Sequence, residues 1–370
     1  MELISRGISL EEIMSVHAFQ HKIPLNGVLE LLPMCNMNCD MCYVRLSREE
    51  MERKGRIRTI EEWVSLAQEM KDAGTLFLLL TGGEPLIFPK FKQLFIALQK
   101  MGMIIAINTN GTLIDEEWAD FFKEHRPRRI NITLYGKNDE AYQKLCHYPG
   151  GFEKVIHGIK LLRERNIDVK LNGSLVRSNS HDWKDIVHIG DIMNVPVRID
   201  AYMYPGERER SIPFDRQSRM EPEEAARCRA NVLLAEMGEE TFRQYARQKL
   251  EKYENTFGRE ENPLKISCRA GKTSFTINWQ GDMMPCVLLD AIRIPVFEKG
   301  FMESWNEIGR RVEELELSAE CGSCSWRNVC DTCPACALLE CGDYKGIPEY
   351  MCRYTKASLK EFQKKLEALD

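Results

Sequence analysis

Short apolar runs alternate with amphipathic segments between Gly27 and about Tyr204. This alternation is the pattern expected of βα units, in which helices join buried parallel strands and cover the sheet. The candidate strands are residues 28–32, 76–80, 104–108, 129–134, 169–176 and 197–203. Six strands of this kind predict an α/β fold, a partial (β/α)6 TIM-like barrel.

The segments between these runs carry helix signals. Thr59 and Glu62 have the spacing of a capping box, and Gly74 follows the last apolar position of the same segment. Apolar residues at helical spacing predict one buried face here and another before the fifth strand: Ile60, Trp63, Val64 and Ala67, and Phe152, Val155, Ile156, Ile159 and Leu162.

The composition of the chain changes twice and predicts its domain limits. A polar, proline-bearing stretch over residues 205–222 follows the last candidate strand, and a charged stretch of helical period runs from Glu223 to about Thr256 with a break near Gly238. From Cys268 the chain is rich in cysteine. We expect an N-terminal helical segment, a barrel, a helical connector and a cysteine-rich domain, at residues 1–26, 27–220, 221–260 and 261–370.

Composition and charge exclude several classes of protein. The 370 residues are 44% hydrophobic and 29% charged, as in a soluble globular protein of two domains. There is no apolar run of about 18 residues for a membrane span, and the N-terminus lacks the basic and apolar regions of a signal peptide. The net charge of -5 gives no electrostatic footprint for nucleic acid. We expect a cytoplasmic protein without a membrane or nucleic-acid partner.

Fourteen cysteines in such a protein indicate metal or cluster ligation, because thiols in the cytosol are kept reduced. Nine of them lie between Cys268 and Cys352. Three others have the spacing Cys35-x3-Cys39-x2-Cys42, directly after the first candidate strand.

Three thiolates in one short loop can hold three irons of a cubane and leave the fourth iron open to an external ligand. The alternative is a tetrahedral zinc site, which needs a fourth ligand nearby. The loop over residues 34–48 offers none.

The CxxxCxxC spacing resembles the signature of the radical S-adenosylmethionine (SAM) family. Residues 81–85, Thr-Gly-Gly-Glu-Pro, follow the second candidate strand and resemble the GGEP segment of that family. The resemblance implies that Cys35, Cys39 and Cys42 hold a 4Fe-4S cluster, that SAM chelates its open iron, and that Gly82, Gly83 and Glu84 position the methionine part of SAM.

The same resemblance implies further contacts to SAM. Thr133, in the fourth strand, aligns with a small hydroxyl residue near the ribose, and Asn172, in the fifth, with a contact to the carboxylate. The residue before the third cysteine is commonly aromatic in the family and is Met41 here. The adenine edge is then expected on Met41 and the backbone at Tyr43.

The C-terminal cysteines resemble a SPASM domain, which usually carries two auxiliary 4Fe-4S clusters. The spacing is Cys268-x12-Gly281-x4-Cys286, then Cys321-x2-Cys324-x5-Cys330-x2-Cys333, and later Cys352. In that family the ligands interleave, so the resemblance implies three clusters in all. One auxiliary cluster would be held by Cys321, Cys324, Cys330 and Cys352, and the other by Cys268, Cys286 and Cys333. Structural zinc knuckles are the alternative for this region.

The chain departs from the fullest SPASM pattern in two places. Residues 269–278 contain no cysteine, so the second of these clusters has either an open iron or another ligand. Cys336 and Cys341 follow Cys333 and either fill the vacancy or stay free. An open iron would suit a substrate thiolate, since soft sulfur ligands favour iron clusters.

Several features have plainer interpretations. Cys146 and Cys228 are predicted to be small buried hydrophobic residues. His17 and His21 have the spacing of a metal pair but no third ligand, and are predicted to be ordinary helix residues. Tyr202, Tyr204 and Glu207, at the end of the last strand, either contact substrate or lie in a surface loop.

Relatives with this combination of domains mostly modify peptides. We expect an enzyme that abstracts hydrogen from a ribosomally made peptide and installs an oxidative crosslink, a thioether or a C–C bond. The alternatives are oxidation of a protein as in sulfatase maturation, peptide epimerisation, and chemistry on a non-peptide small molecule. Sulfatase maturases typically have an aspartate after the cysteine that matches Cys286, and this chain has Val287.

The expected partners follow from this function. Flavodoxin or ferredoxin would supply electrons. The 34 residues before Cys35 are too few for a winged-helix domain that binds a leader peptide. A leader would then be recognised by the barrel, by the SPASM surface or by a separate protein.

Overall fold

A computed structural model of the protein describes residues 9–204, 208–210, 219–254 and 264–369. One β-sheet runs through the whole of this structure. Nine strands of the described residues form it, in the order β6-β5-β4-β3-β2-β1-β7-β8-β9. Strands β1 to β7 pair in parallel, and β8 and β9 are added antiparallel. The strands are β1 (Asn26–Glu30), β2 (Phe77–Thr81), β3 (Ile104–Thr109), β4 (Arg129–Thr133), β5 (Val169–Ser174), β6 (Val197–Asp200), β7 (Ser274–Ile277), β8 (Asp282–Met284) and β9 (Ile294–Pro295).

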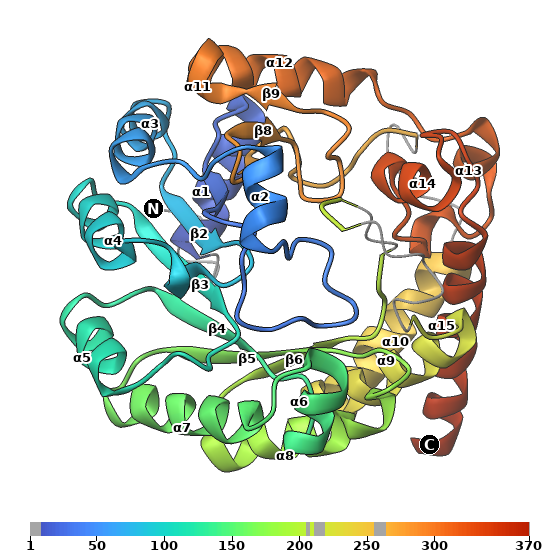
Figure 1. Cartoon of the computed structure of the whole chain (residues 1–370). Helices are drawn as coiled ribbons and strands as arrows, with labels where there is room; N and C mark the ends of the chain where they lie inside the picture. The colour runs from blue at the N-terminus through green and yellow to red at the C-terminus, as the bar shows by residue number, and fades with distance from the viewer. Residues whose placement is uncertain (1–8, 205–207, 211–218, 255–263, 370) are drawn as a thin grey trace.

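Helices join the first six strands, and most of them lie outside the strands in an arc in Figure 1, whereas α2 (Arg48–Lys54) lies nearer the middle of the view. The joining helices are α2, α3 (Ile60–Asp72), α4 (Phe91–Lys100), α5 (Glu116–Glu124), α6 (Asp139–Cys146), α7 (Gly151–Glu164) and α8 (Trp183–Met193), with 3-10 turns at Pro85–Ile87 and Ser180–Asp182. The predicted capping box of Thr59 and Glu62 begins α3. Helix α1 (Leu10–His21) precedes β1.

The predicted partial barrel is confirmed, with all six strands in place. Their ends differ by up to three residues from the apolar runs: β1 ends at Glu30 and β6 at Asp200, where the runs continue to Leu32 and Met203. Leu31 and Leu32 are fully buried, but their backbone groups hydrogen-bond to Thr81 and Gly83, where β2 ends and its turn begins. Buried residues therefore continue beyond the hydrogen-bonded part of the strand. An apolar run in the sequence predicts that a strand is present but does not predict the residue at which it ends.

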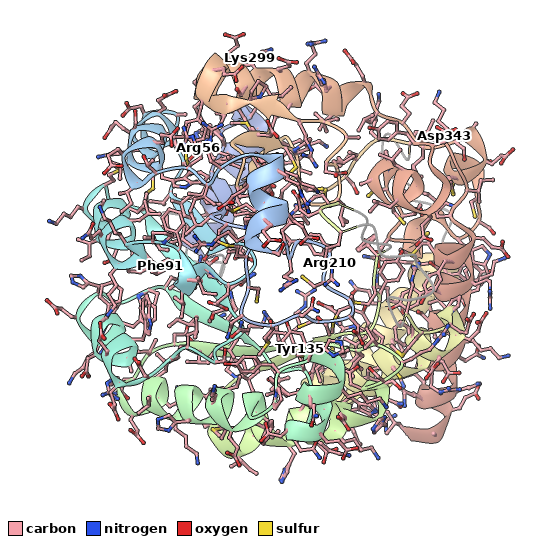
Figure 2. All side chains as sticks on the ribbon, viewed as in Figure 1. Arg56, Phe91, Tyr135, Arg210, Lys299 and Asp343 are labelled. Carbon is pink, nitrogen blue, oxygen red and sulfur yellow. The ribbon has the colours of Figure 1, made fainter. Side chains whose placement is uncertain are left out.

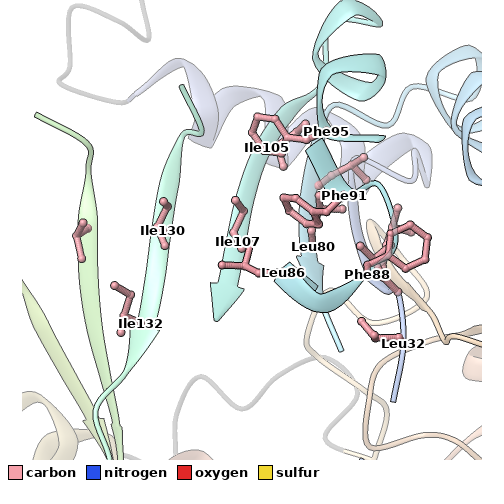
Figure 3. Packing of buried hydrophobic residues seen from close by; sticks show 14 of the residues in the cluster. Leu32, Leu80, Leu86, Phe88, Phe91, Phe95, Ile105, Ile107, Ile130 and Ile132 are labelled. Atoms are coloured by element: carbon pink, nitrogen blue, oxygen red, sulfur yellow. The ribbon is translucent and has the colours of Figure 1, made fainter. Parts of the chain in front are cut away.

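The outer face of the barrel sheet is apolar and packs against the helices. Figure 3 shows Leu80, Ile107 and Ile132 on neighbouring strands, with Phe91 and Phe95 of α4 against them. All five side chains are almost completely buried. This packing is the main hydrophobic core, and it fixes which side of each strand faces inward.

The inner face of the barrel carries polar side chains on β4 and β5. In β5 the buried residues alternate with the half-buried Lys170, Asn172 and Ser174. Asn131 of β4 donates to the side-chain oxygen of Asn108 in β3 over 2.9 Å. Because successive side chains of a strand point to opposite faces, these polar groups share the inside of the barrel.

Three helices form a separate cluster beyond β6, at the lower right of Figure 1. They are α9 (Pro222–Met237), α10 (Glu239–Glu254) and α15 (Glu349–Leu369), and they pack around Phe242 and Phe362. The predicted break at Gly238 separates α9 from α10. The domain limit predicted near residue 260 lies outside the described residues.

The C-terminal region continues the barrel sheet, because β7 pairs with β1 on the side opposite β2. A Cβ on Gly27 would lie 2.7 Å from the ring of Phe275, so the missing side chain lets β7 approach. The Phe275 ring also packs edge-on against Phe301, with centroids 5.1 Å apart. The remaining helices of this region are α11 (Val296–Lys299), α12 (Phe301–Glu314), α13 (Ala319–Ser323) and α14 (Pro334–Cys341), with a 3-10 turn at Arg327–Val329.

Among the described residues, no helix combines the length and the apolar character needed to span a bilayer. The longest, α15, has 21 residues, and many of them are charged.

Phe275→Ala tests whether β7 is anchored by this packing. Removing the buried ring should lower the free energy of unfolding by about 3–5 kcal/mol, through lost burial and the cavity left behind. Phe19→Ala, at a position 45% exposed, is the control and should change it by less than about 1 kcal/mol. Thermal unfolding followed by circular dichroism measures both, and equal shifts would contradict the anchoring role.

Candidate functional site

The first three cysteines lie in the loop that leaves the carboxyl end of β1 and crosses the middle of the molecule (Figure 1). The backbone N–H groups of Asn38 and Asp40 donate to the carbonyl oxygens of Cys146 and Leu145 at the end of α6, each over 3.0 Å. The loop is therefore fixed at its far side as well as at β1. This loop, residues 34–47, is called the cysteine loop below.

The cysteine loop has the donors and the surroundings that an iron–sulfur cluster needs. Cys39 is buried, and Cys35 and Cys42 are half-buried. Burial raises the pKa of Cys35 to about 12 and raises that of Cys42, while a hydrogen bond with Cys146 and burial raise the pKa of Cys39. These thiols keep their protons until positive charge compensates them, and iron supplies such charge. The residues present fit a cluster held at three corners.

The glycine turn after β2 lies directly against the start of the cysteine loop. A Cβ on Gly82 would lie 2.4 Å from the carbonyl oxygen of Leu32, and one on Gly83 only 2.2 Å from that of Met34. The N–H groups of Gly83 and Glu84 donate to the same two oxygens, over 2.8 and 2.9 Å. Any side chain at these glycines would push the loops apart, so the two motifs form one rigid unit.

Glu84 is enclosed by this unit. Its carboxylate accepts from the N–H of Leu86 over 3.1 Å, the hydroxyl of Thr109 over 2.7 Å and the N–H of Asn110 over 2.8 Å. Burial raises its pKa to about 7, although the three hydrogen bonds act in the opposite direction. The side chain has no exposed surface, whereas Gly82 and Gly83 are partly exposed. This geometry favours backbone contacts to a ligand at the glycines, with Glu84 tying β2 to β3.

The sequence analysis missed a ring of polar side chains beside Cys35. Asn110 donates from its amide to the side-chain oxygen of Asn36 over 2.8 Å and to the sulfur of Cys35 over 3.6 Å. Thr112 donates to Asn110 over 2.6 Å and accepts from Asn36 over 2.8 Å. Through its backbone N–H, Asn110 also holds Glu84. The signal was present, because polar residues at the carboxyl end of a barrel strand often belong to the site.

Thr133 and Asn172 are direct neighbours in the register of β4 and β5, and both are half-buried on the inner face. Thr133 is the last residue of β4, and Asn172 lies two residues before the end of β5, in the half of the sheet from which the cysteine loop leaves β1. Their predicted contacts to ribose and carboxylate stay predictions.

Met41 and Tyr43 lie on the inner side of the cysteine loop, where arginines also contact it. The Arg208 guanidinium lies 5.0 Å from the centroid of the Tyr43 ring and pairs with Glu30 over 2.9 Å, with both side chains of the pair buried. Arg210 donates to the carbonyl oxygen of Cys39 over 3.1 Å, and Figure 2 shows it in the middle of the molecule. The sequence analysis assigned no role to these arginines.

The C-terminal cysteines fall into two spatial groups. Burial raises the pKa of Cys352, and the neighbouring Cys330, Cys321 and Cys324 raise it further. Burial raises the pKa of Cys286 to about 11, with further contributions from Cys333 and Cys268. Like charges act in this way only at short range, so each group is a cluster of neighbours. The cysteines named in each case belong to one of the two interleaved ligand sets expected from the sequence; the sets and their binding of iron stay predictions.

The described residues contain no group of three or more histidine, cysteine, aspartate or glutamate side chains placed to bind a single metal ion. Cys146 and Cys228 are buried, as predicted. His17 and His21 lie in α1 with ring centroids 4.4 Å apart.

A cavity of about 640 Å³ is lined by Met41 and Tyr43 of the cysteine loop and by Val287 and Met351 of the C-terminal region. Val287 follows Cys286 in the sequence and Met351 precedes Cys352, but no cysteine of the described residues lines the cavity itself. The remaining wall comes from the ends of β5 and β6 and from α9, α10, α14 and α15, and it includes Ser174, Arg198, Asp200, Tyr202, Tyr204, Arg229, Lys249, Leu288 and Leu339. Tyr202 and Tyr204 therefore line the cavity; Glu207 lies outside the described residues.

Comparison with known proteins agrees with these motifs. The sequence profile of the Radical SAM superfamily matches residues 29–189. An AdoMet-dependent heme synthase of Methanosarcina barkeri is 24% identical over 327 residues, 85% of this chain and 92% of that protein. The subtilosin biosynthesis protein AlbA of Bacillus subtilis is 29% identical over 165 residues, 44% of this chain and 36% of that protein.

Solved structures share the fold over most of the chain. Streptococcus suis SuiB bound to its precursor peptide SuiA superposes with a TM-score of 0.66, at 16% identity, over 92% of this chain and 80% of SuiB. The protein anSMEcpe, with bound AdoMet and the Cp18Cys peptide, gives a TM-score of 0.68 at 17% identity, over 94% of this chain and 98% of its own.

Gly83→Ala tests the contact between the glycine turn and the cysteine loop. The added methyl group has no space beside Met34, so the loop must shift, and the protein should lose the cluster at Cys35, Cys39 and Cys42, about four irons per chain. Gly309→Ala is the control, because its Cβ would make only an ordinary contact at 3.4 Å. Iron analysis after anaerobic purification measures both variants. Full iron content in Gly83→Ala would contradict the contact's importance.

Asn110→Ala tests the amide next to Cys35. Hydrogen bonds to cluster sulfurs stabilise the reduced, more negative state, so their loss should make the midpoint potential of this cluster more negative. An EPR-monitored redox titration measures the shift. Asn131→Ala, which removes an amide that donates to Asn108, should leave the potential unchanged. The same potential in Asn110→Ala and the unaltered protein would refute this role.

Proposed function

Because residues 29–189 form a radical SAM domain, we propose that this chain is a peptide-modifying enzyme that installs an oxidative crosslink, a thioether or a C–C bond. The cavity between the cysteine loop and the C-terminal cysteines carries the proposal. It is large enough for a few side chains and a stretch of backbone, and it lies between the two regions that the chemistry needs.

Each part of the chain has a task in this proposal. Cys35, Cys39 and Cys42 would hold the 4Fe-4S cluster, and Gly82 and Gly83 would bind the methionine part of SAM through their backbone. With SAM bound, the reduced cluster would supply one electron that breaks the C5′–S bond, giving methionine and a 5′-deoxyadenosyl radical, and flavodoxin or ferredoxin would replace that electron. Met41, Tyr43, Thr133 and Asn172 would keep the nucleoside part at the inner face of the barrel.

The crosslink sets an electron balance that the second cysteine group can meet. Forming a C–S bond from a C–H and an S–H bond removes two electrons and two protons from the peptide. One hydrogen atom leaves with 5′-deoxyadenosine, and the second electron needs an acceptor close to the cavity. Cys286 lies next to the cavity-lining Val287 in the sequence, so the auxiliary cluster expected there is within reach.

Comparison with other proteins supports a peptide substrate. The SuiB structure contains a precursor peptide and the anSMEcpe structure contains a peptide, and both share this fold. AlbA acts in the biosynthesis of a bacteriocin. The cavity wall mixes apolar side chains with both signs of charge, which suits a peptide.

Haem synthesis is the second candidate function. The heme synthase of M. barkeri matches along almost its whole length, whereas AlbA matches over about a third of its own. Arg198, Arg229 and Lys249 line the cavity and would suit the carboxylates of a porphyrin.

Leu288→Trp tests the cavity as the substrate site. The larger side chain fills space beside the cysteine loop, so product formation should fall at least tenfold. Cleavage of SAM to 5′-deoxyadenosine without substrate should persist, because no SAM-binding residue changes. Met302→Trp, at a position 46% exposed on α12, is the control. Anaerobic assays with dithionite, read by mass spectrometry, measure both products.

The same assay separates the two functions. A cysteine-containing peptide encoded next to the gene should lose two mass units on modification. An iron porphyrin precursor should remain unchanged, and its conversion to haem would replace the peptide proposal with haem synthesis. Absence of 5′-deoxyadenosine with every substrate would refute radical SAM activity altogether.

A further inference from the structure

Cys336 is a buried thiol for which neither the predicted ligand sets nor the proposed reaction has a use. It has no exposed surface and lies in the first turn of α14. Cys333 is the N-cap of the same helix, three residues earlier. Residues three apart on a helix lie on one face about 5–6 Å apart, a separation that suits two corners of a cubane.

The surroundings of Cys336 are those of the group formed by Cys268, Cys286 and Cys333. Cys286 and Cys333 pack against the apolar cluster that contains Ala335, the residue before Cys336. The sulfur of Cys336 shares a hydrogen bond of 3.6 Å with the hydroxyl of Tyr202. Cys333 therefore contacts the apolar cluster, and Cys336, three residues later, contacts Tyr202 in the wall of the cavity.

The wall of the cavity near Cys336 is also lined by residues next to Cys286. The ring of Tyr202, which shares the hydrogen bond with Cys336, packs edge-on against that of Tyr204, with centroids 4.7 Å apart. Both tyrosines line the same cavity as Val287 and Leu288, the two residues that follow Cys286.

Cys341 has a different environment, although it was an equal candidate from the sequence. It is exposed at the other end of α14. It lies eight residues after Cys333, about 12 Å along the helix axis, which is too far for the two sulfurs to share one cubane.

We propose that Cys336 is the fourth protein ligand of the auxiliary cluster at Cys268, Cys286 and Cys333. This inference rests on the proposed function, which includes the auxiliary clusters, and it changes the role that this cluster would have in the reaction. A cluster with four protein thiolates has no open iron for a substrate thiolate. Its part in the crosslinking reaction is then limited to accepting the second electron, and the substrate thiol is held by the cavity wall.

The test uses a protein that keeps only the C-terminal clusters, the Cys35→Ala/Cys39→Ala/Cys42→Ala variant of the full chain. An iron without a protein thiolate binds added cyanide, which changes the EPR spectrum of the reduced cluster. The spectrum of the triple variant should be unchanged by cyanide. Adding Cys336→Ala should make it respond, whereas adding Cys341→Ala, the matched control, should not.

Two results would overturn the proposal. In one, the triple variant already responds to cyanide, which shows an open iron. In the other, the Cys336→Ala protein contains the same iron as its parent and remains unresponsive. If Cys336→Ala fails to assemble the cluster, Cys336→Ser provides an oxygen ligand, and a shifted spectrum with restored iron supports the proposal while an unshifted one refutes it. None of these results depends on SAM cleavage, so a failure here leaves the proposed function untouched.

Discussion

The site depends on a contact between two stretches of backbone that leaves no room for a side chain. The turn of Gly82 and Gly83 lies against the carbonyl groups of Leu32 and Met34, and two hydrogen bonds hold it there. The contact is short because both residues lack a Cβ atom. It fixes the loop that carries the three cysteines to the neighbouring strand, and Glu84 and Asn110 extend the same connection to β3. Three adjacent strand ends therefore move as one body.

The second organising feature is the continuity of the sheet. β7 pairs with β1, so the cysteine-rich region is built onto the barrel instead of being joined by a flexible link. The cavity is lined both by Met41 and Tyr43 of the cysteine loop and by Val287 and Met351, which are next to C-terminal cysteines in the sequence. A substrate in it would contact residues of both regions without a change in domain arrangement. The fold thus serves the chemistry by fixing the distance between the two.

Local signals predicted much of this structure. The six barrel strands, the capping box at Thr59 and the break at Gly238 depend on neighbours in the sequence, and all are present. Glycine and cysteine spacing located both motifs. Long-range contacts gave no such signal: the pairing of β7 with β1, the hydrogen bond from Arg210 to Cys39, and the amide of Asn110 beside Cys35 join residues more than 70 positions apart. The burial of Cys336, the exposure of Cys341 and the hydrogen bond between Cys336 and Tyr202 likewise depend on the tertiary structure.

The position of β1 in the sheet has a consequence for how such a chain can be shortened. β1 is bonded on one side by β2 and on the other by β7. Deleting all residues after α10 would remove β7 and leave the N–H and C=O groups on one side of β1 unpaired. Exposed strand edges of this kind pair with other chains and promote aggregation. The part of the chain that matches the Radical SAM profile is therefore a poor choice for expression by itself, and a shortened chain should keep β7, which covers the second side of β1.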